Sequence, residues 1–339
     1  MSVLPAPAAI REVPAEAIRS DPALWTSDDT PWIARGMVGD WPIVDAAQSG
    51  DGPFLDYLLK FYDGKKVSAF LGEPSIGGRF FYNESLDGFN FVQVDTTLTK
   101  ITDQLRSLTA EDQPPSLYMG STNLDHWLPG ISDGNALPFF LPDALVSLWL
   151  GNRSTVAPHF DYPANIACCV AGRRQFTLFP PEQVENLYVG PWDLTPAGQP
   201  ISLVNVRDPD LGQFPRFEMA MAQAQHAELL PGDAIYIPSL WWHQVESLAG
   251  VNGLVNYWWS RQPATFGTPM DAFNHALLSI KRLPPSERAA WQKLFDYYVF
   301  SEGASDRSYW PSDRQDRTRE ITDPLARQLR AELSNNLRR

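Results

Sequence analysis

His159-Phe160-Asp161 is the stretch from which both a fold and a site can be predicted, together with Pro238-Ser239-Leu240-Trp241-Trp242-His243 downstream. His159 and Asp161 are two residues apart, so on a β-strand both side chains point to the same face and can hold one ion. His243, at the end of another strand-like run, is the predicted third ligand. Two imidazoles and one carboxylate are typical of a non-haem iron(II) centre with open coordination positions. An HxD triplet also arises by chance, and His243 alone could be a core histidine, so the surrounding sequence decides.

Composition predicts a globular, β-rich protein. The chain has 339 residues, of which 44% are hydrophobic and 20% charged, with 12 Trp, 11 Tyr, 18 Phe and 30 Pro. The net charge of −13 argues against non-specific binding to nucleic acid or to an anionic membrane. No apolar run is long enough to span a bilayer, and residues 1–10 have no basic region of a secretory signal. The only cysteines, Cys168 and Cys169, are adjacent, which indicates strand residues in a reducing compartment, so we expect a cytoplasmic protein.

Residues 1–114 predict a supporting α/β segment of the same domain. Pro53 at the start of an apolar stripe favours a helix, and β-branched and aromatic runs favour strands. No catalytic constellation occurs here. The expected helices cover 11–25, 53–63 and 96–108, and the expected strands cover 31–36, 65–71, 77–82 and 89–92.

Residues 115–262 predict a catalytic core with the fold of a double-sheet jelly roll, so the fold class is mainly β with helical additions. Short strand-like runs cover 117–120, 145–151, 165–170, 175–179, 228–238 and 253–259, with turn signals between them. The turn at Ala171-Gly172 predicts a hairpin of the two strands that flank it. Such a barrel would place the predicted ligands at its mouth.

Residues 182–227 form a long stretch rich in Pro, Gly and Asn, without regular periodicity. Long excursions inside a compact domain are often functional, so we expect it to cover the site entrance and to select the substrate. Trp192, Asn205, Arg207 and Arg216 are candidates for substrate contacts, with ordinary loop and packing roles as the alternative.

Several motifs occur in a fixed order around the predicted ligands. They are His159-Phe160-Asp161, Gly172-Arg173-Arg174 leading to Phe179-Pro180-Pro181, Leu230-Pro231-Gly232-Asp233, Ile237-Pro238 before Trp241-Trp242-His243, and Val255-Asn256-Tyr257-Trp258. In this order they resemble the cupin-like Jumonji-C family of Fe(II)- and 2-oxoglutarate-dependent oxygenases. The resemblance runs from about 117 to 260 and extends more loosely to residues 32–42.

The resemblance implies a ligand set and a co-substrate. His159, Asp161 and His243 would hold Fe(II), leaving three positions for 2-oxoglutarate and dioxygen. Arg174 stands where the family has a lysine that binds the distal carboxylate of 2-oxoglutarate. Here the sequence differs from the family, because an arginine side chain is longer than a lysine and its guanidinium can bind a carboxylate with two hydrogen bonds. The neighbouring Arg173 should face the opposite side of its strand.

Further co-substrate contacts are implied in the same way. Tyr118 matches a tyrosine that binds the distal carboxylate, and Asn165 and Asn256 match amides near the co-substrate. Val156 stands in place of a threonine, although Ser154 and Thr155 precede it. Trp258 is expected to pack against the pocket wall.

Residues 263–339 predict a helical appendage. Helices are expected over 269–281 and 285–301, followed by a polar break over 302–318. Asp323-Pro324 would then cap and start a last helix, with an apolar stripe at Leu325, Leu329, Leu333 and Leu337. The appendage either packs on the barrel or pairs with a second copy, and the resemblance implies a homodimer.

The leading hypothesis is a 2-oxoglutarate-dependent dioxygenase that hydroxylates a protein side chain or a small molecule and releases succinate and CO2. The alternatives are a non-oxygenase metal-dependent cupin, such as an isomerase or sugar-modifying enzyme, and a non-catalytic cupin binding module. The intact triad argues against the binding module, whereas Arg174 and Val156 keep the non-oxygenase cupin open. The sequence does not identify the substrate.

Overall fold

The computed structural model of the chain describes residues 4–262, 266–301 and 321–338. The chain divides into two compact units, Met1–Ser260 and Arg261–Arg339. The N-terminal segment 1–114 therefore lies in the same unit as the strands that follow it. Among the described residues, no helix combines the length and the hydrophobicity needed to cross a bilayer.

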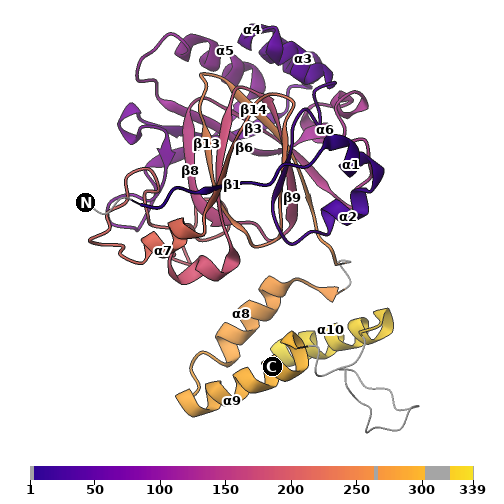
Figure 1. Ribbon diagram of the computed structural model, residues 1–339, viewed down its shortest axis with the longest axis vertical. Coiled ribbons are helices and arrows are strands. Elements are labelled where there is room, and N and C mark those ends of the chain that lie inside the picture. Colours follow the sequence, from indigo (N-terminus) through magenta and orange to yellow (C-terminus); the bar gives the residue numbers. More distant parts are fainter. Residues whose placement is uncertain (1–3, 263–265, 302–320, 339) are drawn as a thin grey trace. The chain divides into compact units, whose positions relative to one another are not determined.

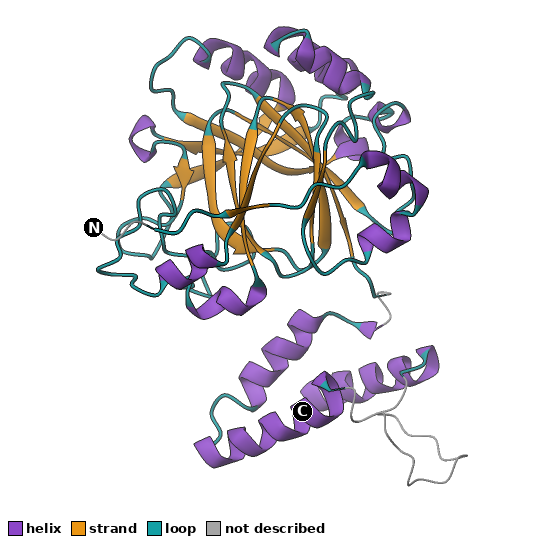
Figure 2. Cartoon of the chain, viewed as in Figure 1, coloured by secondary structure: helices purple, strands orange, loops and turns teal. Residues whose placement is uncertain are grey.

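Two β-sheets form the centre of the first unit, and helices lie around them (Figures 1 and 2). In spatial order, the eight strands of the larger sheet are β2 (Trp32–Ala34), β12 (Ala234–Ile237), β9 (Ala164–Ala171), β14 (Asn252–Trp259), β7 (Leu145–Gly151), β6 (Ser116–Asn123), β3 (Lys66–Gly72) and β5 (Phe91–Thr97). The six strands of the smaller sheet are β1 (Ala8–Ala9), β11 (Gln225–Leu229), β10 (Arg174–Phe179), β13 (Trp242–Ser247), β8 (Ser154–Phe160) and β4 (Arg79–Phe80).

The strands β7 to β14 make the jelly roll. Along the chain they pass back and forth between the larger and the smaller sheet, and most of the pairings within each sheet join strands that are not consecutive in sequence. This is the topology of a double-stranded β-helix, so the predicted fold class is confirmed. The strands β2, β3, β5 and β6 from the N-terminal part extend the larger sheet beyond the jelly roll.

The predicted hairpin of residues 165–170 and 175–179 is wrong. β9 pairs with β12 and β14, whereas β10 pairs with β11 and β13 in the other sheet. The connecting turn thus carries the chain across the sandwich. Gly172 permits it, because φ is 71° and a Cβ there would lie 2.4 Å from the side-chain oxygen of Asn252. A short glycine turn looks the same in sequence for a hairpin and for a crossing between sheets.

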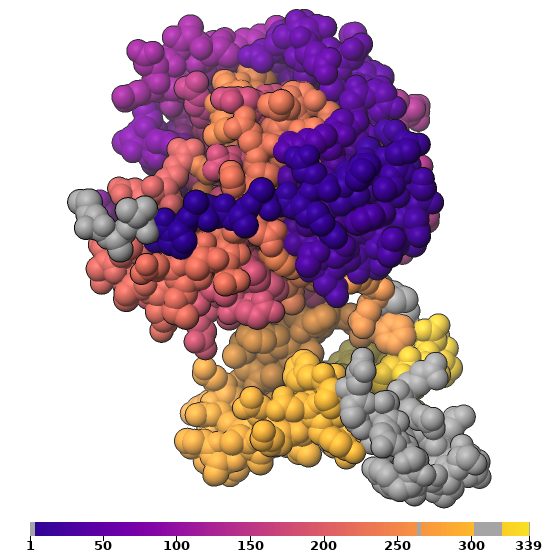
Figure 3. All heavy atoms as spheres, viewed as in Figure 1, coloured from indigo at the N-terminus to yellow at the C-terminus, as the bar shows by residue number. Residues whose placement is uncertain are grey.

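The N-terminal segment departs from prediction in its first helices and in its strands, since β4 covers only Arg79–Phe80 and β5 runs over Phe91–Thr97 instead of 89–92. The expected helix over 11–25 is two short helices, because Pro22 starts a second one whose N-cap, Asp21, accepts the N–H of Leu24 at 3.1 Å. A helix that was not predicted, α3, follows Trp41. The N-terminal strand β1 pairs with β11, and in the space-filling view the first residues form an indigo band across the orange surface of later residues (Figure 3). The helices of this segment are α1 (Ala15–Ser20), α2 (Pro22–Thr26), α3 (Pro42–Gln48), α4 (Asp51–Phe61), the 3₁₀ helix η1 (Pro74–Ile76) and α5 (Leu98–Leu108).

Different segments pack on the outer face of each sheet. Helices α3, α4 and α5 pack their apolar residues on the larger sheet, in one cluster with Met119, Leu148 and Ile166. The excursion after β10 packs on the smaller sheet, where Phe217 joins a cluster with Trp242. The remaining helices of this unit are α6 (Leu124–Trp127), α7 (Phe217–Ala222) and the 3₁₀ helices η2 (Ile131–Asp133) and η3 (Pro181–Glu185).

The second unit is helical in its described residues. It contains α8 (Pro269–Ser279), α9 (Pro285–Phe295), the π-helical turn η5 (Asp296–Phe300) and α10 (Asp323–Leu337). Thr322 is the N-cap of the last helix, one residue before the predicted cap at Asp323. The predicted polar break over 302–318 lies outside the described residues.

Candidate metal centre

The three predicted ligands come together. His159 lies near the end of β8, Asp161 follows that strand, and His243 lies on β13 directly opposite His159 in the antiparallel register. One ligand atom from each residue lies within 4.8 Å of the other two. The two imidazole rings have centroids 4.3 Å apart. A single ion can therefore contact all three side chains.

A β-bulge places His159 on the cavity side of its strand. The pairing of β8 with β13 changes register between His243 and Val245, so that one extra residue is accommodated next to Pro158. Proline has no N–H for the ladder and is typical of such positions. Because of the bulge, Val156 and His159 both face the cavity although they are three residues apart. Without it, one of them would point to the outer face.

Backbone carbonyls orient both imidazoles. His159 Nδ1 lies 2.9 Å from the carbonyl oxygen of Ala157, and His243 Nδ1 lies 3.0 Å from that of Trp241. A carbonyl oxygen only accepts hydrogen bonds, so Nδ1 of each ring carries the proton. Nε2 of each ring is then free as a ligand, which is the usual arrangement of metal-binding histidines.

The protonation states also suit a metal. Burial and, to a smaller extent, the neighbouring His243 lower the pKa of His159, and Asp161 opposes them. The resulting pKa is about 4, so the ring is neutral at pH 7. Burial alone would raise the pKa of Asp161, but its hydrogen bonds and charge interactions with the histidines and Trp258 outweigh it, and the pKa is lowered. A neutral imidazole at His159 and an ionised carboxylate at Asp161 are the forms in which these side chains bind a metal ion.

Trp258 does more than line the pocket. Its indole N–H, on β14, donates to Asp161 Oδ2 at 3.1 Å, and His243 Nε2 lies 3.5 Å from the same oxygen. The indole thus holds the carboxylate in one orientation. The sequence predicted only a packing role, because no local pattern connects Trp258 to a residue 97 positions earlier.

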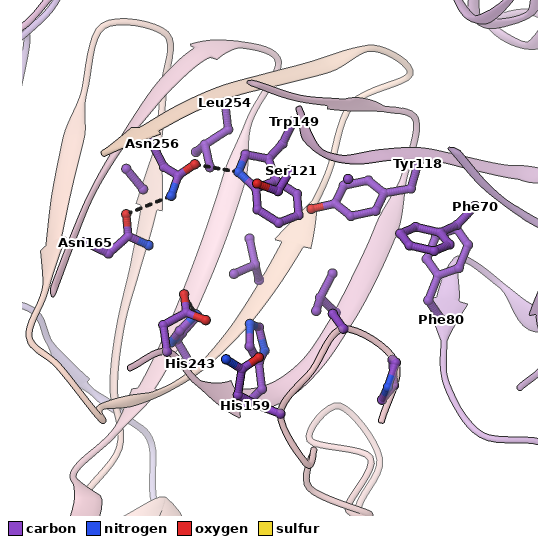
Figure 4. Close-up of a pocket in the computed structure, with 18 of the residues that line it drawn as sticks. Phe70, Phe80, Tyr118, Ser121, Trp149, His159, Asn165, His243, Leu254 and Asn256 are labelled. Carbon is purple, nitrogen blue, oxygen red and sulfur yellow. Dashed lines mark hydrogen bonds and ion pairs between the residues drawn. The ribbon is translucent and has the colours of Figure 1, made fainter. Parts of the chain in front are cut away.

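A cavity of about 550 Å³ lies between the sheets and contains the triad (Figure 4). The four residues predicted to contact the co-substrate, Tyr118, Asn165, Arg174 and Asn256, all line it. Its walls are otherwise mostly apolar and aromatic. Arg174 is the only cationic residue of the described lining, and Asp161 is the only carboxylate.

Arg174 is a buried cation that forms no ion pair with any of the described residues. Its side chain is 1% exposed, and its Nε and Nη2 atoms have no hydrogen-bond partner in the part of the chain that the structure describes. Burial raises the pKa of Tyr118, and the charge of nearby Arg174 opposes this rise only in part. A buried guanidinium with unused donors requires an acceptor, and a carboxylate fits its fork.

A serine hydroxyl lies in the same row of the small sheet. Arg174 is opposite Ser247 on β13, which is opposite Ser154 on β8. The Ser154 hydroxyl is also buried without a partner among the described residues. Val156, in contrast, offers the cavity only methyl groups. Ser154 lies two residues before the position where the family resemblance led us to expect a threonine, but it does not itself line the cavity.

Hydrogen bonds fix the orientation of the two amides (Figure 4). Trp149 Nε1 donates to Asn256 Oδ1 at 2.7 Å, and Asn256 Nδ2 donates to Asn165 Oδ1 at 3.3 Å. An indole N–H only donates, so it sets the direction of the whole chain. The amide N–H groups of Asn165 are left for another acceptor. Trp149 was not predicted from sequence.

The predicted loop contacts lie elsewhere. Trp192, Asn205, Arg207 and Arg216 are all absent from the described cavity lining. Arg207 is paired with the buried Glu246, and the Arg216 guanidinium lies 4.9 Å from the ring centroid of Tyr188. The excursion instead reaches the cavity through four uncharged residues, Pro196, Ala197, Gln199 and Ile201.

Arg173 faces away from the cavity, as predicted. Its guanidinium is exposed and lies 3.0 Å from Glu228 on the neighbouring strand.

The adjacent Cys168 and Cys169 lie buried on β9 as free thiols, and burial raises the pKa of Cys169 to about 12. Neither cysteine lines the cavity.

Comparison with known proteins gives the family. A profile described as a cupin-like domain matches residues 23–265. A lysine-specific demethylase of Arabidopsis thaliana is 33% identical over 34% of this chain and 20% of its own, and the human HSPB1-associated protein 1 is 37% identical over 33% and 23%. Lysine-specific demethylase 8 of Xenopus tropicalis is 28% identical over 68% of this chain and 48% of its own.

The matched stretches span about half or less of these relatives. The match to the cupin-like profile nevertheless covers most of the present chain, including all three predicted ligands and every cavity residue named above. The chain therefore belongs to the cupin-like Jumonji-C family.

Proposed function

We propose that the chain is an Fe(II)- and 2-oxoglutarate-dependent dioxygenase that hydroxylates a C–H bond of a protein side chain or small molecule. The observation that carries the proposal is Arg174, a buried guanidinium with unused donors in the same cavity as a 2-His-1-carboxylate triad. Membership of the cupin-like Jumonji-C family, whose members are Fe(II)- and 2-oxoglutarate-dependent oxygenases, supports it.

The donor set fits the metal. His159 and His243 would each present Nε2, and Asp161 would present its carboxylate. Three protein ligands leave positions open on the ion. When bound, Fe(II) supplies the activation of dioxygen that couples decarboxylation of 2-oxoglutarate to succinate and CO2 with oxidation of the acceptor.

The remaining cavity residues would bind and orient. Arg174 would hold the distal carboxylate with charge-assisted hydrogen bonds, next to Tyr118. Asn165 would offer its amide N–H groups to the co-substrate. The apolar walls would exclude water from the reacting centre.

Anaerobic reconstitution tests the proposal. The protein with Fe(II) should develop a metal-to-ligand charge-transfer band when 2-oxoglutarate is added, and succinate should form on admission of oxygen. His243→Ala should abolish both, whereas the control His226→Ala, an exposed histidine on β11, should retain both. Absence of the band together with absence of succinate in the unaltered protein would refute the proposal and favour a non-oxygenase cupin.

We also propose that the helical unit forms a homodimer. Several large apolar side chains of α8 and α9 are exposed in the single chain, including Leu278 at 71% and Trp291 at 45%. Apolar stripes of this kind are stabilised by pairing with a second copy. Sedimentation of the full chain should give a dimer that Leu278→Glu and Leu294→Glu shift to monomer, whereas Leu86→Glu on the first unit should not. A monomeric unaltered protein would contradict this.

A further inference from the structure

Part of the cavity lining comes from β3, β4, β5 and α6, and we call this part the outer lobe. Six residues define it: Ser68, Phe70, Phe80, Phe91, Gln93 and Trp127. The cavity volume of about 550 Å³ is in the range of roughly 300–1,000 Å³ that accepts a drug-sized ligand, which is far larger than a five-carbon diacid. The outer lobe is thus left over when 2-oxoglutarate occupies the triad and Arg174.

We propose that the outer lobe receives an uncharged apolar or aromatic group of the acceptor substrate. This rests on the proposed function, because it places the acceptor beside the co-substrate in one cavity. The relatives named as lysine-specific demethylases would suggest a cationic side chain instead. The chemistry of the lining argues for a neutral group in this chain.

The first argument is charge. In the described lining, Asp161, His159 and His243 belong to the triad and Arg174 is assigned to the diacid. Every other lining residue except Tyr118 is non-ionisable. A protonated amine in the outer lobe would lose its water without gaining a carboxylate partner. A second carboxylate would likewise find no cation there. A neutral group avoids both penalties.

The second argument is the shape of the aromatic residues. Phe91 meets Phe70 and Phe80 edge to face, with centroids 5.3 and 5.4 Å apart and interplanar angles of 78° and 77°. The rings pack against each other as a wall, so their faces are partly covered and do not surround a cation. Such a wall offers a large apolar contact surface.

The wall continues toward the triad. Phe80 packs on Tyr118 at 5.9 Å, Tyr118 stacks on Trp149 at 5.8 Å, and Trp149 meets Trp258 at 5.6 Å. Figure 4 shows Phe70 and Phe80 on the far side of Tyr118 from Trp149. Trp258 in turn donates to the ligand Asp161. An apolar group can therefore follow one aromatic surface from the lobe to the reacting centre.

The lining residues at the rim of the lobe are polar and uncharged, and Asp95, opposite Ser68, lies outside them. Gln93 is exposed, lies opposite Phe70 in the pairing of β5 with β3, and donates to the Ser68 hydroxyl at 2.7 Å. Residues opposite each other on paired strands project to the same face. Asp95, the next residue on that face of β5, is exposed and is not part of the described lining. The rim can bond a neutral polar substituent.

Probes that differ only in charge test the proposal. The protein is loaded with Zn(II) and N-oxalylglycine, a non-reactive analogue of 2-oxoglutarate, and Kd values are measured by ligand-observed NMR for phenylpropanol, phenylpropylamine and phenylpropionate. We expect the neutral alcohol to bind about tenfold more tightly than either ion. Equal binding of all three, tighter binding of the amine or its trimethylated form, or no binding of the alcohol overturns the proposal.

Four variants locate the binding. Phe91→Ala should weaken the alcohol about fivefold, whereas Phe140→Ala, an exposed control outside the cavity, should not. Gln93→Glu should strengthen the amine a few-fold and leave the alcohol unchanged, as expected for an exposed ion pair. Asp95→Asn should change neither value. An unchanged alcohol Kd in a folded Phe91→Ala protein contradicts the proposed location.

Different measurements test the proposed oxygenase activity and the proposed class of acceptor substrate. The charge-transfer band with Fe(II) and 2-oxoglutarate reports the co-substrate without any acceptor. Its absence refutes the oxygenase, whereas its presence with no preference for the neutral probe refutes only the acceptor class.

Discussion

Trp149 Nε1 donates to Asn256 Oδ1 at 2.7 Å, although the two residues are 107 positions apart. This bond determines the orientation of both cavity amides, because Asn256 must then donate to Asn165. An amide that could rotate would present its oxygen as readily as its nitrogen. Trp149 therefore orients two asparagines of the cavity lining.

The first prediction concerns this chain of hydrogen bonds. Trp149→Phe keeps an aromatic ring but removes the N–H, so the amides lose their fixed direction. We expect N-oxalylglycine to bind the Zn(II)-loaded protein about tenfold more weakly, the effect of one hydrogen bond to a charged group. Asn256→Asp keeps the acceptor for Trp149 but removes the donor to Asn165, and should give a similar loss. If both variants fold and bind the analogue normally, the positioning role is wrong.

The second prediction separates stability from binding at Arg174. In the protein without ligands this guanidinium is buried and its Nε and Nη2 lack described partners. Arg174→Met should therefore stabilise the apoprotein by about 1–3 kcal/mol in the free energy of unfolding. The same variant should lose the rise in Tm that 2-oxoglutarate causes in the unaltered metal-loaded protein. Arg173→Met, on the exposed side of the strand, is the matched control and should show neither effect.

The third prediction concerns the indole that holds the metal ligand. Trp258→Phe removes the donor to Asp161 Oδ2, so the carboxylate is less well oriented. Loss of such a partner typically lowers metal affinity 10- to 100-fold, which competition with a metal indicator measures. Trp41→Phe loses an equivalent indole bond, to the carbonyl of Ala136 outside the cavity, and should keep its metal affinity. Equal affinities for the two variants would contradict the assignment.

The fourth prediction concerns a loop arginine that was a candidate for substrate contact. Arg207 pairs with Glu246, whose side chain is only 3% exposed on the outer face of β13. Arg207→Ala should lower the free energy of unfolding by about 1–3 kcal/mol, because it leaves a buried carboxylate without its partner. Adding Glu246→Gln should recover part of the loss. The Kd of the neutral probe should remain unchanged in both proteins, and a change in Kd without a change in stability would restore the substrate role.

The sequence by itself determined the donor set and the fold class. His159 and Asp161 share a face because side chains alternate along a strand, and this needs no tertiary information. The series of short strands with turn signals likewise indicated a jelly roll, because strand length and turn residues are local properties. The motif order then indicated the cavity residues Tyr118, Asn165, Arg174 and Asn256.

Tertiary structure decided what depends on contacts between distant residues. Gly172 could end a hairpin or lead across the sandwich, and only the pairing of β9 and β10 with different neighbours distinguishes these. The bonds from Trp149 to Asn256 and from Trp258 to Asp161 leave no local pattern, because each joins separate strands. The unused donors of Arg174 are a property of the packed cavity, since sequence specifies a cation but not what surrounds it.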